Sequence, residues 1–171
     1  MIESKRLYLR ELTMKDIPAL FKVLGDAENM KYYPYTFDLA LVEKWIRRNQ
    51  ERYRVLGFGL WAVCLKETDE LIGDCGLTMQ LIDGLISPEI GYHIRRDLQQ
   101  KGYASEASRA VRDWAFTHTP FKTIYSYMKY TNIPSRRTAL KWGAHFEKEY
   151  VDEINEKTAV YFMSKDDWER R

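Results

Sequence analysis

Residues 99–105, with the sequence QQKGYAS, combine the features of an anion-binding site. They lie between an alternating apolar pattern that ends near residue 95 and a helical pattern that begins near Ala104. The first backbone N–H groups of a helix have no partner within the helix, and the helix dipole adds positive potential there. Gly102 allows an anion to approach the backbone closely, and Ser105 can offer a hydroxyl group. The segment predicts a pyrophosphate site. An ordinary loop and helix start is the alternative, because short glycine motifs also match by accident.

Basic residues flank this segment in the sequence and suit a ligand with several negative charges. A basic face in contact with water is the alternative for each of them. The basic residues are Arg95, Arg96, Lys101, Arg136, Arg137 and Lys141.

Hydrophobic periodicity predicts the elements that must position these residues. A short polar connection at 67–70 indicates a hairpin, and strand–helix–strand steps cross over in parallel. The pattern therefore predicts one α/β domain over residues 1–171, with a mixed, mostly antiparallel central sheet of about seven strands and about four flanking helices. The expected strands are 7–12, 58–66, 71–79, 88–95, 123–130, 144–150 and 158–164, and the expected helices are 14–24, one after Asp38, one from Tyr103 to before Pro120, and 133–142.

Composition and charge fit one such domain and argue against other classes of protein. The chain has 171 residues, of which 45% are apolar and 14% aromatic, enough for one core. Lys and Arg total 27 against 25 Asp and Glu, and this net charge of +2 gives little basis for binding nucleic acid or membrane. No apolar stretch approaches the roughly 20 residues of a membrane span, and no apolar signal core is present, so a cytoplasmic protein is expected. The two cysteines and three histidines lack metal-ligand spacing, and no metal site is predicted.

Several short motifs, in order, resemble the GNAT superfamily of acyl-CoA-dependent N-acyltransferases. The acetyl-CoA signature of that family is Gln or Arg, two residues, Gly, one residue, then Gly or Ala, and Gln99, Gly102 and Ala104 fit its fixed positions. The resemblance extends over nearly the whole chain and is closest to the branch of the ribosomal-protein alanine acetyltransferases RimJ and RimL. The motifs that carry it are 6–10 (RLYLR), 71–77 (LIGDCGL), 89–92 (EIGY), 101–107 (KGYASEA) and 132–137 (NIPSRR).

Three positions depart from the family pattern. Gln100 stands where the branch usually has Gly, and residues 141–144 read KWGA where a Lys-Leu-Gly-Phe segment is usual. Many members also place a Tyr seven residues beyond the Asn to protonate the departing thiolate, and here that position is Ala139. The usual general acid is therefore missing. A catalytically degenerate module that binds acyl-CoA without turnover is the alternative to an active enzyme.

The resemblance implies acetyl-CoA as cosubstrate and a fold in which two strands splay apart to admit the pantetheine arm. Carried onto this sequence, the exposed strand backbone runs from His93 to Arg95, its partner strand is 123–130, and the pyrophosphate lies on the amides of 100–105. The implied cofactor-binding residues are His93, Ile94, Arg95, Arg96, Gln99, Gln100, Lys101, Gly102, Tyr103, Ala104, Ser105, Asn132 and Arg137.

Attack on a thioester requires a neutral amine, so a nearby group must accept a proton. Glu89 is the expected base, because a carboxylate on a central strand is costly to bury unless it is paired or functional. A structural salt bridge is its alternative role, and His93, on the same face by the period of 2, is a weaker candidate. In the resembling branch, a serine three residues beyond the Asn is thought to face the sulfur of CoA. Ser135 holds that position, and a helix cap is its alternative role.

Aromatic residues are expected to wall the acceptor side of the cleft, with core packing as the alternative. The expected partner is a primary amine, either a peptide or protein N-terminus or a small-molecule amine. Deprotonation at pH 7 costs an α-amine about 1.4 kcal/mol and a Lys side chain about 4.6 kcal/mol, and this difference favours the α-amine. The oligomeric state stays open, with a homodimer as one option. The expected substrate-binding residues are Tyr32, Tyr33, Tyr35 and Trp61.

An RNA-binding sheet is a further alternative, because Tyr125, Tyr127 and Tyr130 place aromatic residues on a strand beside basic ones. The glycine and flanking pattern of an RNA-recognition strand is missing. The ordered family motifs therefore favour an acetyltransferase that does not bind nucleic acid.

Overall fold

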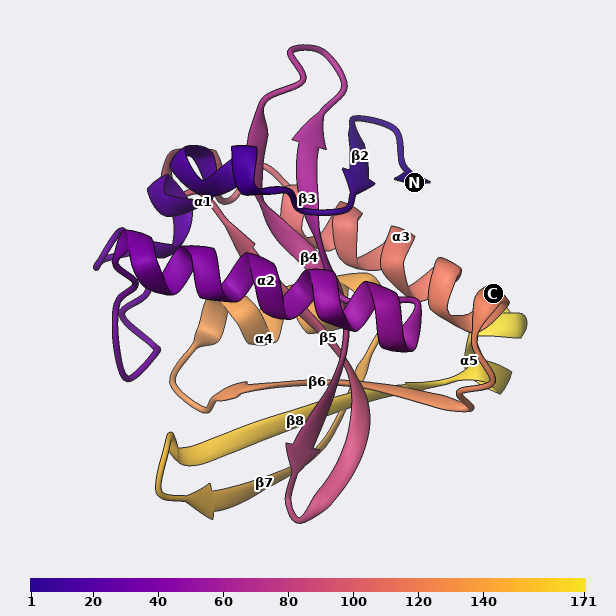
Figure 1. The fold of residues 1–171 in the computed structure, drawn as a ribbon. Coiled ribbons are helices and arrows are strands. Elements are labelled where there is room, and N and C mark those ends of the chain that lie inside the picture. Colours follow the sequence, from indigo (N-terminus) through magenta and orange to yellow (C-terminus); the bar gives the residue numbers. More distant parts are fainter.

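The computed structural model describes all 171 residues and shows a twisted eight-stranded sheet between two layers of helices (Figure 1). Only β5 and β6 pair in parallel, and every other neighbouring pair in the order β1-β2-β3-β4-β5-β6-β8-β7 is antiparallel. This confirms the predicted α/β class with a mixed, mostly antiparallel sheet. The strands are β1 (Ile2–Glu3), β2 (Leu7–Arg10), β3 (Leu60–Leu65), β4 (Leu71–Ile82), β5 (Leu85–Ile94), β6 (Thr123–Lys129), β7 (His145–Asp152) and β8 (Glu156–Ser164), and the helices are α1 (Ile17–Leu24), α2 (Leu39–Leu56), α3 (Tyr103–His118), α4 (Ile133–Trp142) and α5 (Lys165–Glu169).

Alternation along the central strands divides the core between the two faces of the sheet. On β3, Trp61 and Val63 join the cluster that packs beneath α3 and α4, whereas Ala62 and Cys64 join the cluster beneath α1 and α2. The sheet is therefore buried on both faces, which explains the nearly continuous apolar run of β3. None of the helices has the length and apolar character needed to cross a membrane.

Strands β5 and β6 meet at one point and then separate. Their parallel pairing consists of Glu89 opposite Tyr125, whereas β5 pairs with β4 from Leu85 to Ile94. Beyond Glu89, β5 pairs in register with β4 alone, and its last contact with β6 is the hydrogen bond that the Ser126 hydroxyl donates to the Ile90 carbonyl at 3.0 Å. This is the separation of strands that the family resemblance implies.

The hairpin of β4 and β5 is longer than the sequence analysis predicts. The expected loop between residues 79 and 88 is instead continuous strand, closed by a tight turn at Asp83 and Gly84 with φ of 47° and 81°. An Asp-Gly pair is a strong signal for a two-residue turn, because both central residues need positive φ. That signal was available in the sequence and would have placed the turn correctly.

Other differences concern the ends of elements and two short elements. The first expected strand stops at Arg10 rather than residue 12, and the helix after it opens with a 3-10 turn at Met14–Asp16. Two short elements, β1 and α5, were not predicted, because segments of two and five residues carry too little periodicity. The helix expected after Asp38 is α2, and Asp38 caps it by accepting a hydrogen bond from the Leu41 N–H at 2.8 Å.

Candidate active site

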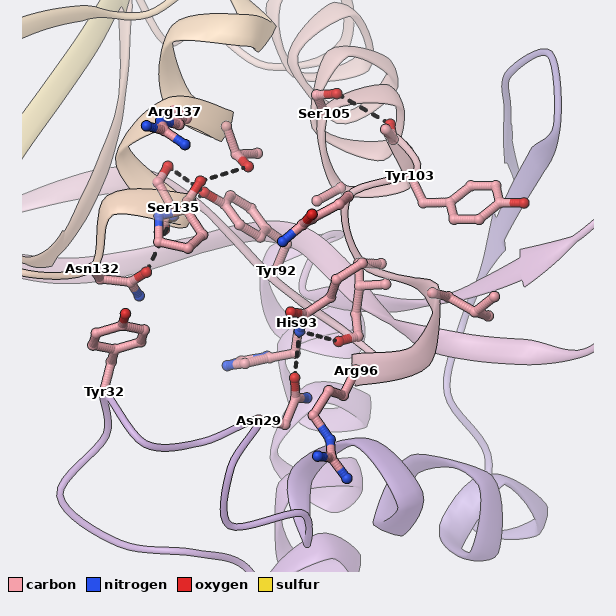
Figure 2. Close-up of a pocket in the computed structure, with 18 of the residues that line it drawn as sticks. Asn29, Tyr32, Tyr92, His93, Arg96, Tyr103, Ser105, Asn132, Ser135 and Arg137 are labelled. Carbon is pink, nitrogen blue, oxygen red and sulfur yellow. Dashed lines mark hydrogen bonds between the residues drawn. The ribbon is translucent and has the colours of Figure 1, made fainter.

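A cleft of about 560 Å³ opens where the end of β5 meets the first turns of α3 and α4 (Figure 2). The segment between α1 and α2 closes its other side with Tyr32 and Tyr33. Most of the residues expected from the sequence therefore come together in one place. Those that line the cleft are Tyr32, Tyr33, His93, Ile94, Arg96, Gln99, Gln100, Gly102, Tyr103, Ala104, Ser105, Asn132, Ser135 and Arg137.

Five expected residues lie outside the cleft lining, one of which, Glu89, is described below. Trp61 was expected to wall the acceptor side, but it lies in the core. It is 7% exposed, stacked on Tyr53 and edge-on to Trp114. Tyr35 is exposed and packs on Phe37 rather than in the cleft. Arg95 is absent from the cleft lining and forms ion pairs with Glu70 at 2.6 Å and Asp97 at 2.7 Å. Lys101 is exposed, outside the cleft lining.

The turn into α3 presents a run of free backbone donors. The N–H groups from Gln100 to Ser105 donate to no protein acceptor, and the helix ladder begins only with the bond from Glu106 N–H to the Gly102 carbonyl at 3.0 Å. Gly102, the N-cap, has a φ of 83°, and Gln100 has a φ of 61°. Both lie in the left-handed region that favours Gly, which accounts for the Gly that the family usually carries at the position of Gln100. The geometry is that of an anion-binding helix N-terminus.

Arg6 fixes this turn from outside the cleft. Its Nε forms an ion pair with Glu106 at 2.7 Å, and its Nη1 donates to the Lys101 carbonyl at 3.0 Å. Its guanidinium also stacks over the Tyr103 ring, 4.3 Å from the centroid. The resembling motif 6–10 thus has a structural role that the sequence analysis did not assign, since residues 6 and 106 are far apart along the chain.

Positive charge dominates the cleft. Four cationic side chains line it against one carboxylate, Glu28. Lys31 pairs with Glu28 at 2.8 Å and Arg96 with Asp26 at 2.9 Å, whereas Arg137 and Lys141 form no ion pair. The two unpaired cations make the α4 side attractive to phosphate groups.

The start of α4 brings two hydroxyl groups together. Asn132 is the helix cap, accepting from the Ser135 N–H at 3.2 Å, so the cap role considered for Ser135 belongs to Asn132. The Ser135 Oγ lies 2.8 Å from the Tyr92 hydroxyl, which also donates to the Ser135 carbonyl at 2.9 Å (Figure 2). Sequence reasoning missed Tyr92, because it attended to the Glu89 face of β5 and Tyr92 lies on the other one.

Glu89, the expected base, is buried on β5. Its side chain accepts a hydrogen bond from the Thr78 hydroxyl at 3.0 Å, and the residue is 7% exposed and outside the cleft lining. Burial raises the pKa of Glu89 to about 7, although the Thr78 hydrogen bond and the charges of His93 and Arg52 oppose the rise. A carboxyl group with such a pKa exchanges its proton near neutral pH, as a catalytic base must.

His93, four residues further along the same strand, lines the cleft and forms a second titratable site. Its Nδ1 lies 2.7 Å from the Asp74 carboxylate, and the other oxygen of Asp74 accepts from the Trp45 indole N–H at 2.9 Å. Burial alone would lower the pKa of His93, but the carboxylates of Asp74 and Glu89 outweigh burial and raise it. Asp74 lies within the resembling motif 71–77, yet only the pairing of β4 with β5 reveals its partner.

Comparison with known proteins agrees with this geometry. The family described as "Acetyltransferase (GNAT) domain" matches residues 6–145, so the chain belongs to the GNAT acetyltransferase family and is an acyltransferase. It is 34% identical to the Bacillus subtilis protein YkkB over 159 residues, covering 92% of each chain. It is also 30% identical to the Bacillus subtilis N-acetyltransferase YnaD, covering 98% of each chain.

Solved structures share the fold over almost the full length. An acetyltransferase of the GNAT family from Bacillus anthracis superimposes with a TM-score of 0.83 at 24% identity, covering 96% of this chain and 98% of that one. A ribosomal-protein-S5-alanine acetyltransferase from Vibrio fischeri gives 0.78 at 18% identity, covering 97% of each chain. At these identities the likeness concerns the fold alone.

Proposed function

We propose that this protein transfers an acetyl group from acetyl-CoA to a primary amine, by direct attack of the neutral amine on the thioester. The observation that carries the proposal is the run of free backbone N–H groups from Gln100 to Ser105 in the cleft. Such a run at a helix start suits a pyrophosphate, and the unpaired Arg137 and Lys141 suit further phosphate charge. The residues present therefore fit the cosubstrate of the family.

The separated strands give the rest of the cosubstrate a place to lie. No residue of β6 pairs with β5 at His93 and Ile94, and the Ile94 carbonyl accepts only the Gln99 side-chain amide, at 3.0 Å. An extended amide chain could therefore lie there like an added strand if it displaced that side chain. Asn132 would border this chain from the start of α4. When bound, acetyl-CoA supplies the acetyl group in activated form, as a thioester.

Two sets of side chains would serve the reaction. The attacking amine must lose a proton, and Glu89 and His93, on the same face of β5, are the groups placed to accept it. The Ser135 hydroxyl, held by Tyr92, would hydrogen-bond the departing sulfur, which suits a chain with the apolar Ala139 at the family's usual tyrosine position.

The acceptor would enter beside Tyr32 and Tyr33, the two predicted aromatic residues that line the cleft. A protein or peptide α-amine is the preferred nucleophile, because it is neutral at pH 7 at a smaller cost in free energy than a Lys side chain. The ordered motifs support membership of the RimJ/RimL branch, in which such α-amines are acetylated. The fold shared with the Vibrio fischeri enzyme is consistent with that branch.

Thiol release from acetyl-CoA tests this function against a panel of peptides with free N-termini, polyamines, aminoglycosides and amino acids. We expect the highest kcat/KM with a peptide. A far higher kcat/KM with spermidine or an aminoglycoside would refute the α-amine preference and leave acetyl transfer standing. Tight acetyl-CoA binding without thiol release would instead support the degenerate binding module, which the burial of Ala139 at the usual acid position favours.

A further inference from the structure

His93 and Asp74 form a fixed pair beside the cleft. They are register partners on β5 and β4, joined at 2.7 Å from Nδ1 to Oδ1. Asp74 is fully buried, and its second oxygen is occupied by the Trp45 indole N–H. Because a carboxylate only accepts hydrogen bonds, the neutral imidazole carries its hydrogen on Nδ1 and its lone pair on Nε2.

The second ring nitrogen of His93 is free. His93 lines the cleft, and its Nε2 has no hydrogen-bond partner within the protein and is not buried. The rings of Tyr33 and Trp45 pack against the imidazole, with centroids at 5.2 Å and 6.0 Å, so its orientation is held from two further sides. We propose that His93 is the catalytic residue that accepts the proton of the attacking amine, and that Asp74 is the positioning residue that fixes its ring. This inference rests on the proposed acetyl transfer and names the base of that reaction.

Glu89 is less suited to the same role. Its carboxyl group accepts a hydrogen bond from the Thr78 hydroxyl, and the residue lies outside the cleft lining, whereas His93 is part of that lining. The charged groups around His93 are Asp74 from β4 and Glu89 from its own strand, and Arg52 from α2 lies near both carboxylates. Tyr33, from the segment before α2, packs against the ring. The carboxylates of Asp74 and Glu89 both stabilise an imidazolium at His93. Glu89 thus supports proton acceptance by His93 without touching the amine.

The proposed transfer needs no reactant other than the amine, acetyl-CoA and water. The lone pair of the neutral amine forms the new N–C bond with the acetyl carbonyl carbon, and the C–S bond breaks with its electron pair going to sulfur. The proton leaving nitrogen passes to the lone pair of His93 Nε2, and Asp74 stabilises the resulting imidazolium through Nδ1–H. The imidazolium then returns its proton to water, and the thiolate gains one from water or from the hydroxyl pair at Ser135.

Three variants separate the two candidate bases, with a hexapeptide carrying an N-terminal alanine as the probe amine. His93→Gln removes the lone pair and should lower kcat by about 10²–10⁴-fold while leaving acetyl-CoA affinity unchanged by calorimetry. Glu89→Gln should keep kcat within about tenfold of the wild type. His145→Gln, at an exposed position on β7, is the matched control and should change neither quantity. A His93→Gln variant with a kcat near that of the wild type, combined with a Glu89→Gln variant that is inactive, would overturn the proposal.

Asp74→Asn tests the positioning role by a readout that a purely structural residue would not move. The base must be unprotonated, so kcat/KM rises with pH through the pKa of His93, and removing the Asp74 charge should move that rise to lower pH. An unmoved profile with a merely lower rate would count against the pair.

A measurement without turnover separates failure of this inference from failure of the proposed function. Nitrogen-15 NMR of the imidazoles reports which ring nitrogen of His93 carries hydrogen. A wild type that releases no thiol with any amine would refute acetyl transfer. At a pH above the pKa of His93, where the imidazole is neutral, an unprotonated Nε2 would still support the pair and a protonated Nε2 would overturn it.

Discussion

The two ends of the cleft are built from different parts of the chain. At the α3 end, the donors are backbone N–H groups from Gln100 to Ser105, and side chains serve to hold the turn in place. At the β5 end, the functional groups are side chains: His93 lines the cleft and contacts Asp74, and Glu89 is buried on the same strand. Binding through backbone N–H groups requires a particular backbone conformation and no side chain in the way of the ligand. Chemistry through ionisable side chains depends on their charge. The first should respond to an added Cβ and the second to pH.

The largest expected effect concerns Glu89, at the side-chain end, and the pH dependence of the free energy of unfolding. Burial raises the pKa of Glu89 to about 7 from its ordinary value of 4.5, so the folded protein keeps a proton that the unfolded chain releases between these values. Stability contributed by Glu89 is therefore lost as pH rises through that window. The side chain of Glu89→Gln cannot ionise, so the variant should not lose this stability. Between pH 4.5 and 7, its free energy of unfolding minus that of the wild type should increase by up to about 3 kcal/mol.

Urea unfolding of both proteins across this pH range measures the gain. Glu153→Gln, at an exposed position between β7 and β8, is the control and should show no such trend. A constant difference between Glu89→Gln and wild type at every pH would show that Glu89 ionises alike in the folded and unfolded states, and the contrast between the two ends would weaken.

The next effect concerns the backbone end. Gly102→Val places a branched side chain at a φ of 83°, on the turn where a pyrophosphate would touch the amides, and should weaken acetyl-CoA binding at least tenfold, about 1.4 kcal/mol. Gly84→Val is a matched control, because Gly84 has a φ of 81° in the hairpin turn, with open space around it and no contact with the cleft. Both variants carry similar backbone strain, so only Gly102→Val should lose affinity in calorimetry. Equal affinities in two folded variants would place the phosphates elsewhere.

The same contrast explains what the sequence could predict. The α3 turn, its free amides and the cap of α2 depend on residues close together in the chain, so spacing and residue type were enough to predict them. The pairs Asp74 with His93 and Arg6 with Glu106 join segments that only sheet pairing and helix packing bring together. Trp61 failed as an acceptor residue for the same reason, since its side of β3 is set by the register of the sheet.

The smallest expected effects separate two neighbouring residues at the start of α4, where the backbone and side-chain ends of the cleft meet. Asn132 accepts the Ser135 N–H and caps the helix, so Asn132→Ala should lower the free energy of unfolding by about 1 kcal/mol. Ser135 makes its side-chain hydrogen bond to Tyr92 instead, so Ser135→Ala should leave stability nearly unchanged and lower kcat by about tenfold, through loss of a hydroxyl near the departing sulfur.

Melting and thiol release, measured on the same preparations, give both quantities. Tyr92→Phe is the companion variant, because it removes the hydroxyl that holds Ser135 and leaves the Ser135 hydroxyl in place. If that hydroxyl must be oriented to act, Tyr92→Phe should lower kcat by a smaller factor than Ser135→Ala. A Ser135→Ala variant that loses about 1 kcal/mol of stability and keeps its rate per folded molecule would make Ser135 part of the helix start alone. In that case the thiolate departs without help from a side chain of α4, and the chemistry of the cleft resides entirely on β5.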